Sequence, residues 1–158
     1  MNTRLLALVL FPAVFLPGCF FAVGVSPSSA NANIVIIGRW SATTSDSAGS
    51  ANGVWTLTQS GTSLSGTTRI TDDTRDMTGN GTIRGAVNGQ SITFRMDVPT
   101  GGFGGMMARC SMVIDGEGTV SDDGRKITGS YTGSLTGMMA LQRSCGGTLG
   151  RGTFSMTR

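Results

Sequence analysis

The 158-residue chain contains no histidine, and only 13% of its residues are charged. Without an imidazole it has no Ser-His-Asp triad, no histidine general base and none of the usual histidine-containing zinc sites. No serine lies in a Gly-x-Ser-x-Gly elbow, and the glycine-rich stretch 101–105 is not followed by the Lys-Ser/Thr of a phosphate loop. These absences predict a protein that is not an enzyme and has neither a cofactor nor a metal site.

Charge and periodicity remove further classes of protein. The 12 basic and 9 acidic residues are scattered, and no basic stripe alternates with aromatic residues, so we expect no nucleic-acid partner. The 25 glycines follow no three-residue period, which excludes collagen, and no sustained heptad predicts a coiled coil. What remains is one small domain.

Residues 1–32 have the pattern of an export signal, and residues 33–158 are expected to form a single domain. A short positive start precedes an apolar run, Leu5 to Val25, which two prolines and a glycine interrupt; this disfavours an uncleaved membrane span. Leu-Pro-Gly-Cys at 16–19 resembles a lipobox that would acylate Cys19, whereas Ala-Asn-Ala at 30–32 suits ordinary signal peptidase. We predict a periplasmic or secreted protein, or a lipoprotein whose one membrane contact is a lipid on Cys19.

Apolar residues in 33–158 alternate at period two, and no window shows helical spacing, which predicts an all-β domain. Asn88-Gly89 is the strongest hairpin signal, and Gly116 and Gly118 predict a bulge. The expected strands are Ile34 to Thr44, Gly53 to Gln59, Thr62 to Ile70, Gly81 to Val87, Gln90 to Val98, Arg109 to Val120, Arg125 to Ser134 and Thr148 to Arg158.

The connections between these strands alternate in length. Tight turns follow the second, fourth and sixth strands, and long loops are expected near 45–52, 71–80, 99–108 and 135–147. In an up-and-down sheet, alternate connections fall at opposite ends. The long loops would therefore share one end of an eight-stranded antiparallel up-and-down β-barrel with a mouth, in which closure removes exposed sheet edges.

Gly38-Arg39-Trp40 on the first expected strand resembles the Gly-x-Trp signature of the calycins, the superfamily of lipocalins and avidins. The resemblance implies that Trp40 closes the base of a barrel and that a basic residue of the last strand, Arg151 or Arg158, covers it. Val54 to Gly61 and Leu64 to Thr67 also resemble small exported bacterial barrels of this kind. The resemblance does not extend to biotin, because the tryptophans that line an avidin site come from later strands.

Cys110 and Cys145, the two cysteines outside the export segment, predict a structural disulfide. Each follows a methionine pair in a long loop, Met106 and Met107 in one, Met138 and Met139 in the other, and the bridge would bring the pairs together. The flexible methionines and the nearby Phe103 form either a binding mouth or an inward-folded lid over a small core.

Three acidic clusters, at 72–76, 115–117 and 122–123, are interpreted as solvated positions; the second lacks the ligands of a calcium loop. The sequence leaves two functions open. The first is that the barrel binds a small apolar or amphipathic ligand at its long-loop end. The second is that it is a cell-envelope interaction module or inhibitor that binds a protein through its outer loops. Whether the interior is open or filled decides between them, and no oligomeric state is predicted.

Overall fold

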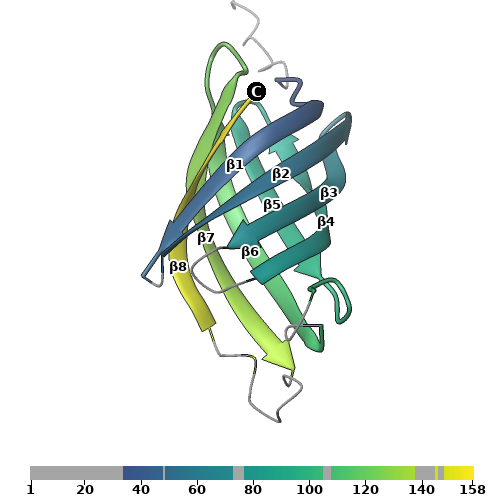
Figure 1. Ribbon diagram of the computed structural model, residues 1–158. Coiled ribbons are helices and arrows are strands. Elements are labelled where there is room, and N and C mark those ends of the chain that lie inside the picture. Colours follow the sequence, from purple (N-terminus) through teal and green to yellow (C-terminus); the bar gives the residue numbers. More distant parts are fainter. Residues whose placement is uncertain (1–33, 48, 73–76, 105–107, 138–144, 146–147) are drawn as a thin grey trace, which may run out of the picture. The chain divides into compact units, whose positions relative to one another are not determined.

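The computed structural model describes residues 34–47, 49–72, 77–104, 108–137, 145 and 148–158. These residues form a closed antiparallel barrel in which each strand pairs with the next and β8 pairs back with β1 (Figure 1). The eight-stranded antiparallel β-barrel expected from the sequence is confirmed. Its strands are β1 (Gly38–Asp46), β2 (Gly49–Ser60), β3 (Ser63–Asp72), β4 (Met77–Asn88), β5 (Ser91–Val98), β6 (Cys110–Val120), β7 (Lys126–Gly137) and β8 (Thr148–Thr157).

Alternation along each strand separates the core from the outer wall. On β5, Ile92, Phe94 and Met96 are buried, whereas Thr93 and Arg95 are exposed. Successive side chains of a strand point to opposite faces, so every second residue enters the barrel. The buried apolar residues of all eight strands form one core cluster.

Tight turns close the end of the barrel that we call the turn end, where β2 joins β3, β4 joins β5 and β6 joins β7. Gly61 and Gly89 adopt φ of 58° and Gly124 adopts φ of 65°, a left-handed conformation that favours glycine. The predicted hairpins at these three places are present, with Gly89 and Gln90 forming the turn that Asn88-Gly89 signals.

The opposite end, which we call the loop end, differs from the sequence expectation. Only residues 47–48 separate β1 from β2, and only residues 73–76 separate β3 from β4, so the long loops expected at 45–52 and 71–80 are wrong. Polar Ser, Thr and Asn residues there continue the ladders instead, down to the pairs Asp46–Gly49 and Asp72–Met77. The two long connections that do occur are residues 99–109 and 138–147.

Two further details of the strands are corrected. Pairing runs unbroken through Gly116 and Gly118, and the irregularity lies between Gly133 and Ser134 instead. The first strand begins at Gly38 rather than Ile34, because residues 34–37 cross the turn end: the Ile34 amide donates to Gly89 O and the Ile36 amide to Gln59 Oε1. Ile36 is thereby fully buried and plugs that end.

Candidate functional site

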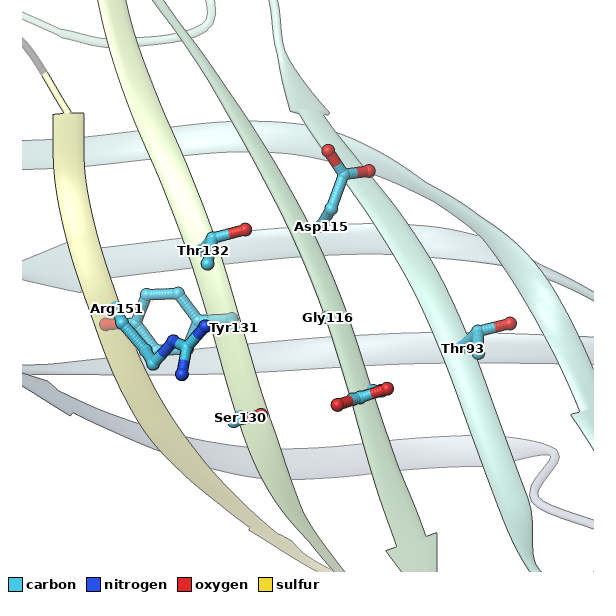
Figure 2. A pocket seen from close by; sticks show the side chains of 8 residues that line it. Thr93, Asp115, Gly116, Ser130, Tyr131, Thr132 and Arg151 are labelled. Carbon is cyan, nitrogen blue, oxygen red and sulfur yellow. The ribbon is translucent and has the colours of Figure 1, made fainter.

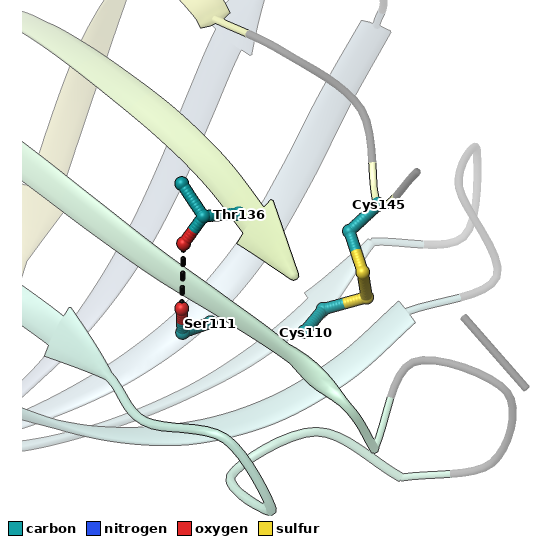
Figure 3. Close-up of a disulfide and its surroundings, with 4 residues drawn as sticks. All are labelled: Cys110, Ser111, Thr136 and Cys145. Atoms are coloured by element: carbon teal, nitrogen blue, oxygen red, sulfur yellow. Dashed lines mark hydrogen bonds between the residues drawn. A yellow bond between two sulfur atoms is a disulfide. The ribbon is translucent and has the colours of Figure 1, made fainter. Parts of the chain in front are cut away.

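The two long connections leave the same end of the barrel and are joined by a disulfide. Cys110 is the first residue of β6 and Cys145 lies in the connection that precedes β8; their sulfur atoms are 2.08 Å apart and their Cα atoms 5.7 Å apart (Figure 3). Both cysteines are buried. Close by, the hydroxyls of Ser111 and Thr136 are 2.8 Å apart across β6 and β7. The bridge therefore ties the second loop to the strand that follows the first.

The first loop is fastened to the barrel by Phe103. Its backbone forms a bridge with Gly79 of β4, and Gly104 N–H donates to Thr78 O at 3.0 Å. The ring is 3% exposed and lies where a side chain on Gly79 would be, with a Cβ there only 2.6 Å from it. Phe103 thus helps to close the loop end and does not offer an exposed aromatic anchor. Met106, Met107, Met138 and Met139 lie outside the described residues.

The barrel interior contains a cluster of three aromatic side chains. The ring centroids of Trp55 and Phe94 are 4.8 Å apart at 79°, those of Phe94 and Phe154 are 5.3 Å apart at 83°, and those of Trp55 and Phe154 are 6.3 Å apart at 19°. The first two contacts are edge-to-face, which is favourable because the positive ring edge meets the negative ring face, and the third is stacked. The cluster fills the middle of the barrel.

Inward glycines provide the space for these rings. A Cβ on Gly116 would overlap the Phe94 ring, one on Gly129 would lie 2.7 Å from the Phe154 ring, and one on Gly152 would overlap Tyr131. At these three positions a small inward residue therefore faces a bulky one. At these positions the interior side chains are packed closely against one another.

The barrel interior also contains a buried hydroxyl group beside the aromatic cluster. Thr68 on β3 is 3% exposed, and its Oγ1 makes no hydrogen bond with the described part of the chain. It lies opposite Trp55 in the β2–β3 register. A buried hydroxyl without a partner costs about 1–3 kcal/mol, so this position favours a polar guest.

The turn end is closed by Trp40 and Arg158. Trp40 is fully buried and donates from Nε1 to Ile36 O at 2.9 Å. Arg158 stacks on it, with Cζ 4.8 Å from the ring centroid, and donates to Val35 O and Ile37 O. Gly38, with φ of 125°, lets the chain enter β1 beside this pair. Arg151, the other arginine considered, lies exposed on the outer wall.

A shallow hollow of about 320 Å³ lies on that outer wall, across β5 to β8 (Figure 2). A second hollow of about 440 Å³ adjoins it and shares Thr93, Glu117 and Ser130. The alternation in the sequence places Thr93, Glu117 and Ser130 on the outer face. Their proximity depends on the register between neighbouring strands, which the sequence does not reveal, so the sequence analysis missed this site. The first hollow is lined by Thr93, Asp115, Gly116, Glu117, Ser130, Tyr131, Thr132 and Arg151.

The acidic clusters at 115–117 and 122–123 lie on different parts of the barrel, whereas Asp73 and Asp76 of the first cluster lie outside the described residues. Asp115 and Glu117 point outward from β6, whereas Asp122 and Asp123 lie in the β6–β7 turn. The Ser121 hydroxyl and the Arg125 backbone amide both donate hydrogen bonds to the Asp123 carboxylate. These bonds, the Ser121 bond most of all, lower the pKa of that carboxyl below its ordinary value. Within the described ranges, no three acidic or cysteine side chains gather as metal ligands, and no helix is long and apolar enough to cross a membrane.

Comparison of the chain with protein-family models, with curated proteins and with solved structures gave no match.

Proposed function

We propose that the protein is an exported, non-enzymatic β-barrel of the calycin type that binds another protein of the cell envelope through its loop end. The barrel supplies a rigid base, and the two long connections supply the contact surface. It reaches its compartment through the export segment 1–32, and a lipid on Cys19 would keep it at the outer face of a membrane.

The observation that carries this proposal is the disulfide between Cys110 and Cys145. It ties the second long connection to the first residue of β6, directly after the first long connection, whereas the connections at the turn end are tight hairpins. Holding two loops together lowers the conformational entropy that they lose when they close on a partner. The contacts among the aromatic side chains support the same choice, because these rings occupy interior volume that a ligand would otherwise use.

A second function is favoured by one observation. The buried Thr68 hydroxyl, which has no hydrogen-bond partner among the described residues, lies opposite Trp55 in the interior, where a small amphipathic guest would pair with it. Such a ligand would enter past Phe103, which covers Gly79. The aromatic cluster beside Thr68 confines this guest to a small volume, so the protein-binding function is preferred.

Site-specific photo-crosslinking in the cells that make the protein tests the proposal. A photoreactive residue replaces Ala108, which is exposed beside the first long loop; matched controls replace Asn88 at the turn end and Thr56 on the outer wall, both exposed. We expect a discrete protein adduct from position 108 that positions 88 and 56 do not give. The adduct should weaken when Cys110 and Cys145 are both changed to alanine.

Adducts of the same mass from all three positions would contradict the proposal, since they would mean that contact is not confined to the loop end. A position-108 variant that is correctly exported and folded but gives no adduct would also contradict it. Circular dichroism of each purified variant shows whether the barrel has formed.

A further inference from the structure

Glu117 lies at the centre of a grid of hydroxyl groups on the outer wall. In the register of β5, β6 and β7, it is flanked by Thr93 on one side and Ser130 on the other. One step toward the turn end, Thr119 on the same strand lies between Ser91 and Thr128. Because adjacent strands are about 4.8 Å apart, these side chains are within reach of one ligand.

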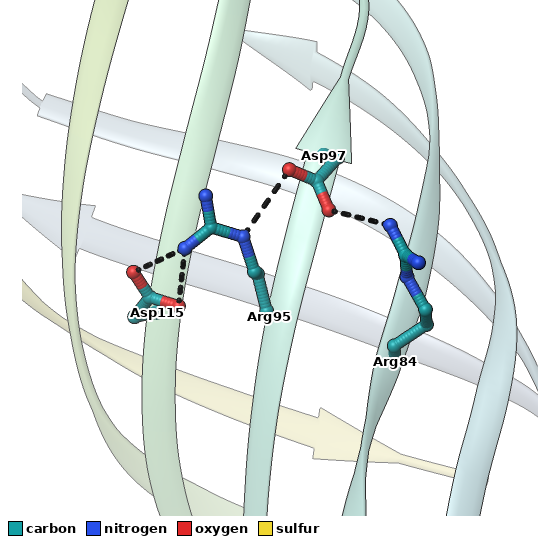
Figure 4. A network of polar contacts seen from close by, with 4 residues as sticks. All are labelled: Arg84, Arg95, Asp97 and Asp115. Carbon is teal, nitrogen blue, oxygen red and sulfur yellow. Dashed lines mark hydrogen bonds and ion pairs between the residues drawn. The ribbon is translucent and has the colours of Figure 1, made fainter.

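The charges next to this grid are already paired with one another. Arg95 donates to both carboxylate oxygens of Asp115 at 3.2 Å and to Asp97 at 3.4 Å, and Arg84 lies 3.6 Å from Asp97 (Figure 4). In the described part of the chain, Glu117 has no hydrogen-bond or ion-pair partner. Its carboxylate is therefore available to a ligand.

The other available charge at the hollow is Arg151. It lies on β8 opposite Thr132, whose other neighbour is Asp115. Among the described residues the Arg151 guanidinium makes no ion pair either. The hollow of about 320 Å³, which Arg151 lines, and the hollow of about 440 Å³ share Glu117. We call the two hollows together the trough; it follows β6.

We propose that this trough is a saccharide-binding site. A carboxylate accepts hydrogen bonds from two adjacent sugar hydroxyls, a guanidinium donates to sugar oxygens, and the Ser and Thr hydroxyls both donate and accept. The unpaired carboxylate of Glu117 repels phosphate and other compact anions, and Ser and Thr hydroxyls recur along the lining of both hollows. A neutral, hydroxyl-rich chain can form hydrogen bonds with the carboxylate, the guanidinium and the hydroxyl groups of the trough.

This site is separate from the loop end. The saccharide proposal can therefore be tested independently of the proposed protein partner. The trough is shallow and exposed, which predicts weak binding in the millimolar range, about −4 kcal/mol. A protein that holds a partner at one end and a polysaccharide along its wall would be retained at a sugar-rich layer of the envelope.

The test is an ¹⁵N NMR titration of the purified protein with neutral oligosaccharides: cello-, malto- and chito-trioses. At least one is expected to shift the amides of Glu117, Thr119 and Ser130 selectively. Glu117→Gln and Arg151→Gln should each weaken that binding about tenfold or more. Arg69→Gln, which removes an exposed arginine of β3, should leave it unchanged.

The three variants alter exposed side chains, and their amide spectra show directly whether the barrel remains folded. If none of the three oligosaccharides shifts the trough amides at about 10 mM, the proposal is wrong. It is also wrong if binding occurs but Arg69→Gln weakens it as much as Glu117→Gln does.

Discussion

The hydroxyl of Tyr131 on β7 donates to Oδ2 of Asp46 on β1 at 3.2 Å, across the strand that lies between them. Gly152 of β8 is the residue paired with Tyr131, and it has no side chain to block the ring. The bond thus links three strands at the place where the barrel closes. It is partly buried, where a hydrogen bond to a charged group contributes about 1.5–3 kcal/mol.

Gly152→Ala is expected to lower the free energy of unfolding by about 1–3 kcal/mol, because its Cβ would overlap the Tyr131 ring. Urea unfolding monitored by circular dichroism measures the change. Gly150→Ser serves as control: a Cβ there meets nothing within 4 Å, although its φ of 77° adds strain. A Gly152→Ala protein more stable than this control would contradict the packing described.

Gly116→Ala should also destabilise the barrel by about 1–3 kcal/mol, because its Cβ would overlap the Phe94 ring. Phe94→Leu shortens the side chain and should partly relieve that overlap. A double-mutant cycle is therefore expected to show coupling of about 1 kcal/mol or more between the two sites. Strictly additive effects would mean that the glycine does not accommodate the ring.

Replacing both Cys110 and Cys145 with alanine should cost about 4 kcal/mol on the chain-entropy model, because the bridge joins residues 35 positions apart. The measurement is the free energy of unfolding in urea with and without reductant. Reductant should destabilise the native protein and leave the double variant unaffected. A native protein insensitive to reductant after full reduction of the thiols would contradict a stabilising role for the bridge.

Arg158→Gln is expected to cost about 1 kcal/mol, since it removes the cation above Trp40 and weakens the bonds to Val35 O and Ile37 O. Intrinsic fluorescence should change as water reaches the Trp40 indole. Arg151→Gln is the matched control, because that arginine lies on the outer wall and should leave the emission unchanged. Equal emission from the two variants would rule out Arg158 as the cover of Trp40.

Ser121→Ala should raise the pKa of Asp123 toward its ordinary value of 3.8, because the Ser121 hydroxyl is the main group that stabilises the carboxylate. The folded state thereby loses stabilisation that is present above pH 3.8 and is lost as pH falls through the lower native value. A ¹³C NMR titration of the side-chain carboxyl measures the shift. An unchanged pKa would show that Arg125 N–H suffices.

The inward-facing residues of this barrel follow from alternation, which depends only on neighbouring residues. On β5, the period-two pattern identifies Ile92, Phe94 and Met96 as inward residues, as observed. The same pattern failed at the loop end. Stretches 45–52 and 71–80 contain polar and glycine residues that suit both loops and exposed ladders, and only pairing with a neighbouring strand makes them strands.

The candidate sites were less accessible to sequence reasoning, because they depend on lateral register. Nothing local predicts that Glu117 lies between Thr93 and Ser130, or that Gly79 receives Phe103. The pairing of Cys110 with Cys145, by contrast, needs no register, since they are the two cysteines outside the export segment. The methionine pairs that the sequence singles out stay a prediction.

Native mass spectrometry of the protein isolated from its own envelope tests most directly whether it works through its loop end and not through an interior ligand. We expect the mass of the processed polypeptide with its disulfide, with or without a lipid on Cys19, together with a complex that releases an intact second protein on activation. A small molecule bound in equal amount and released only when the barrel unfolds would contradict the account.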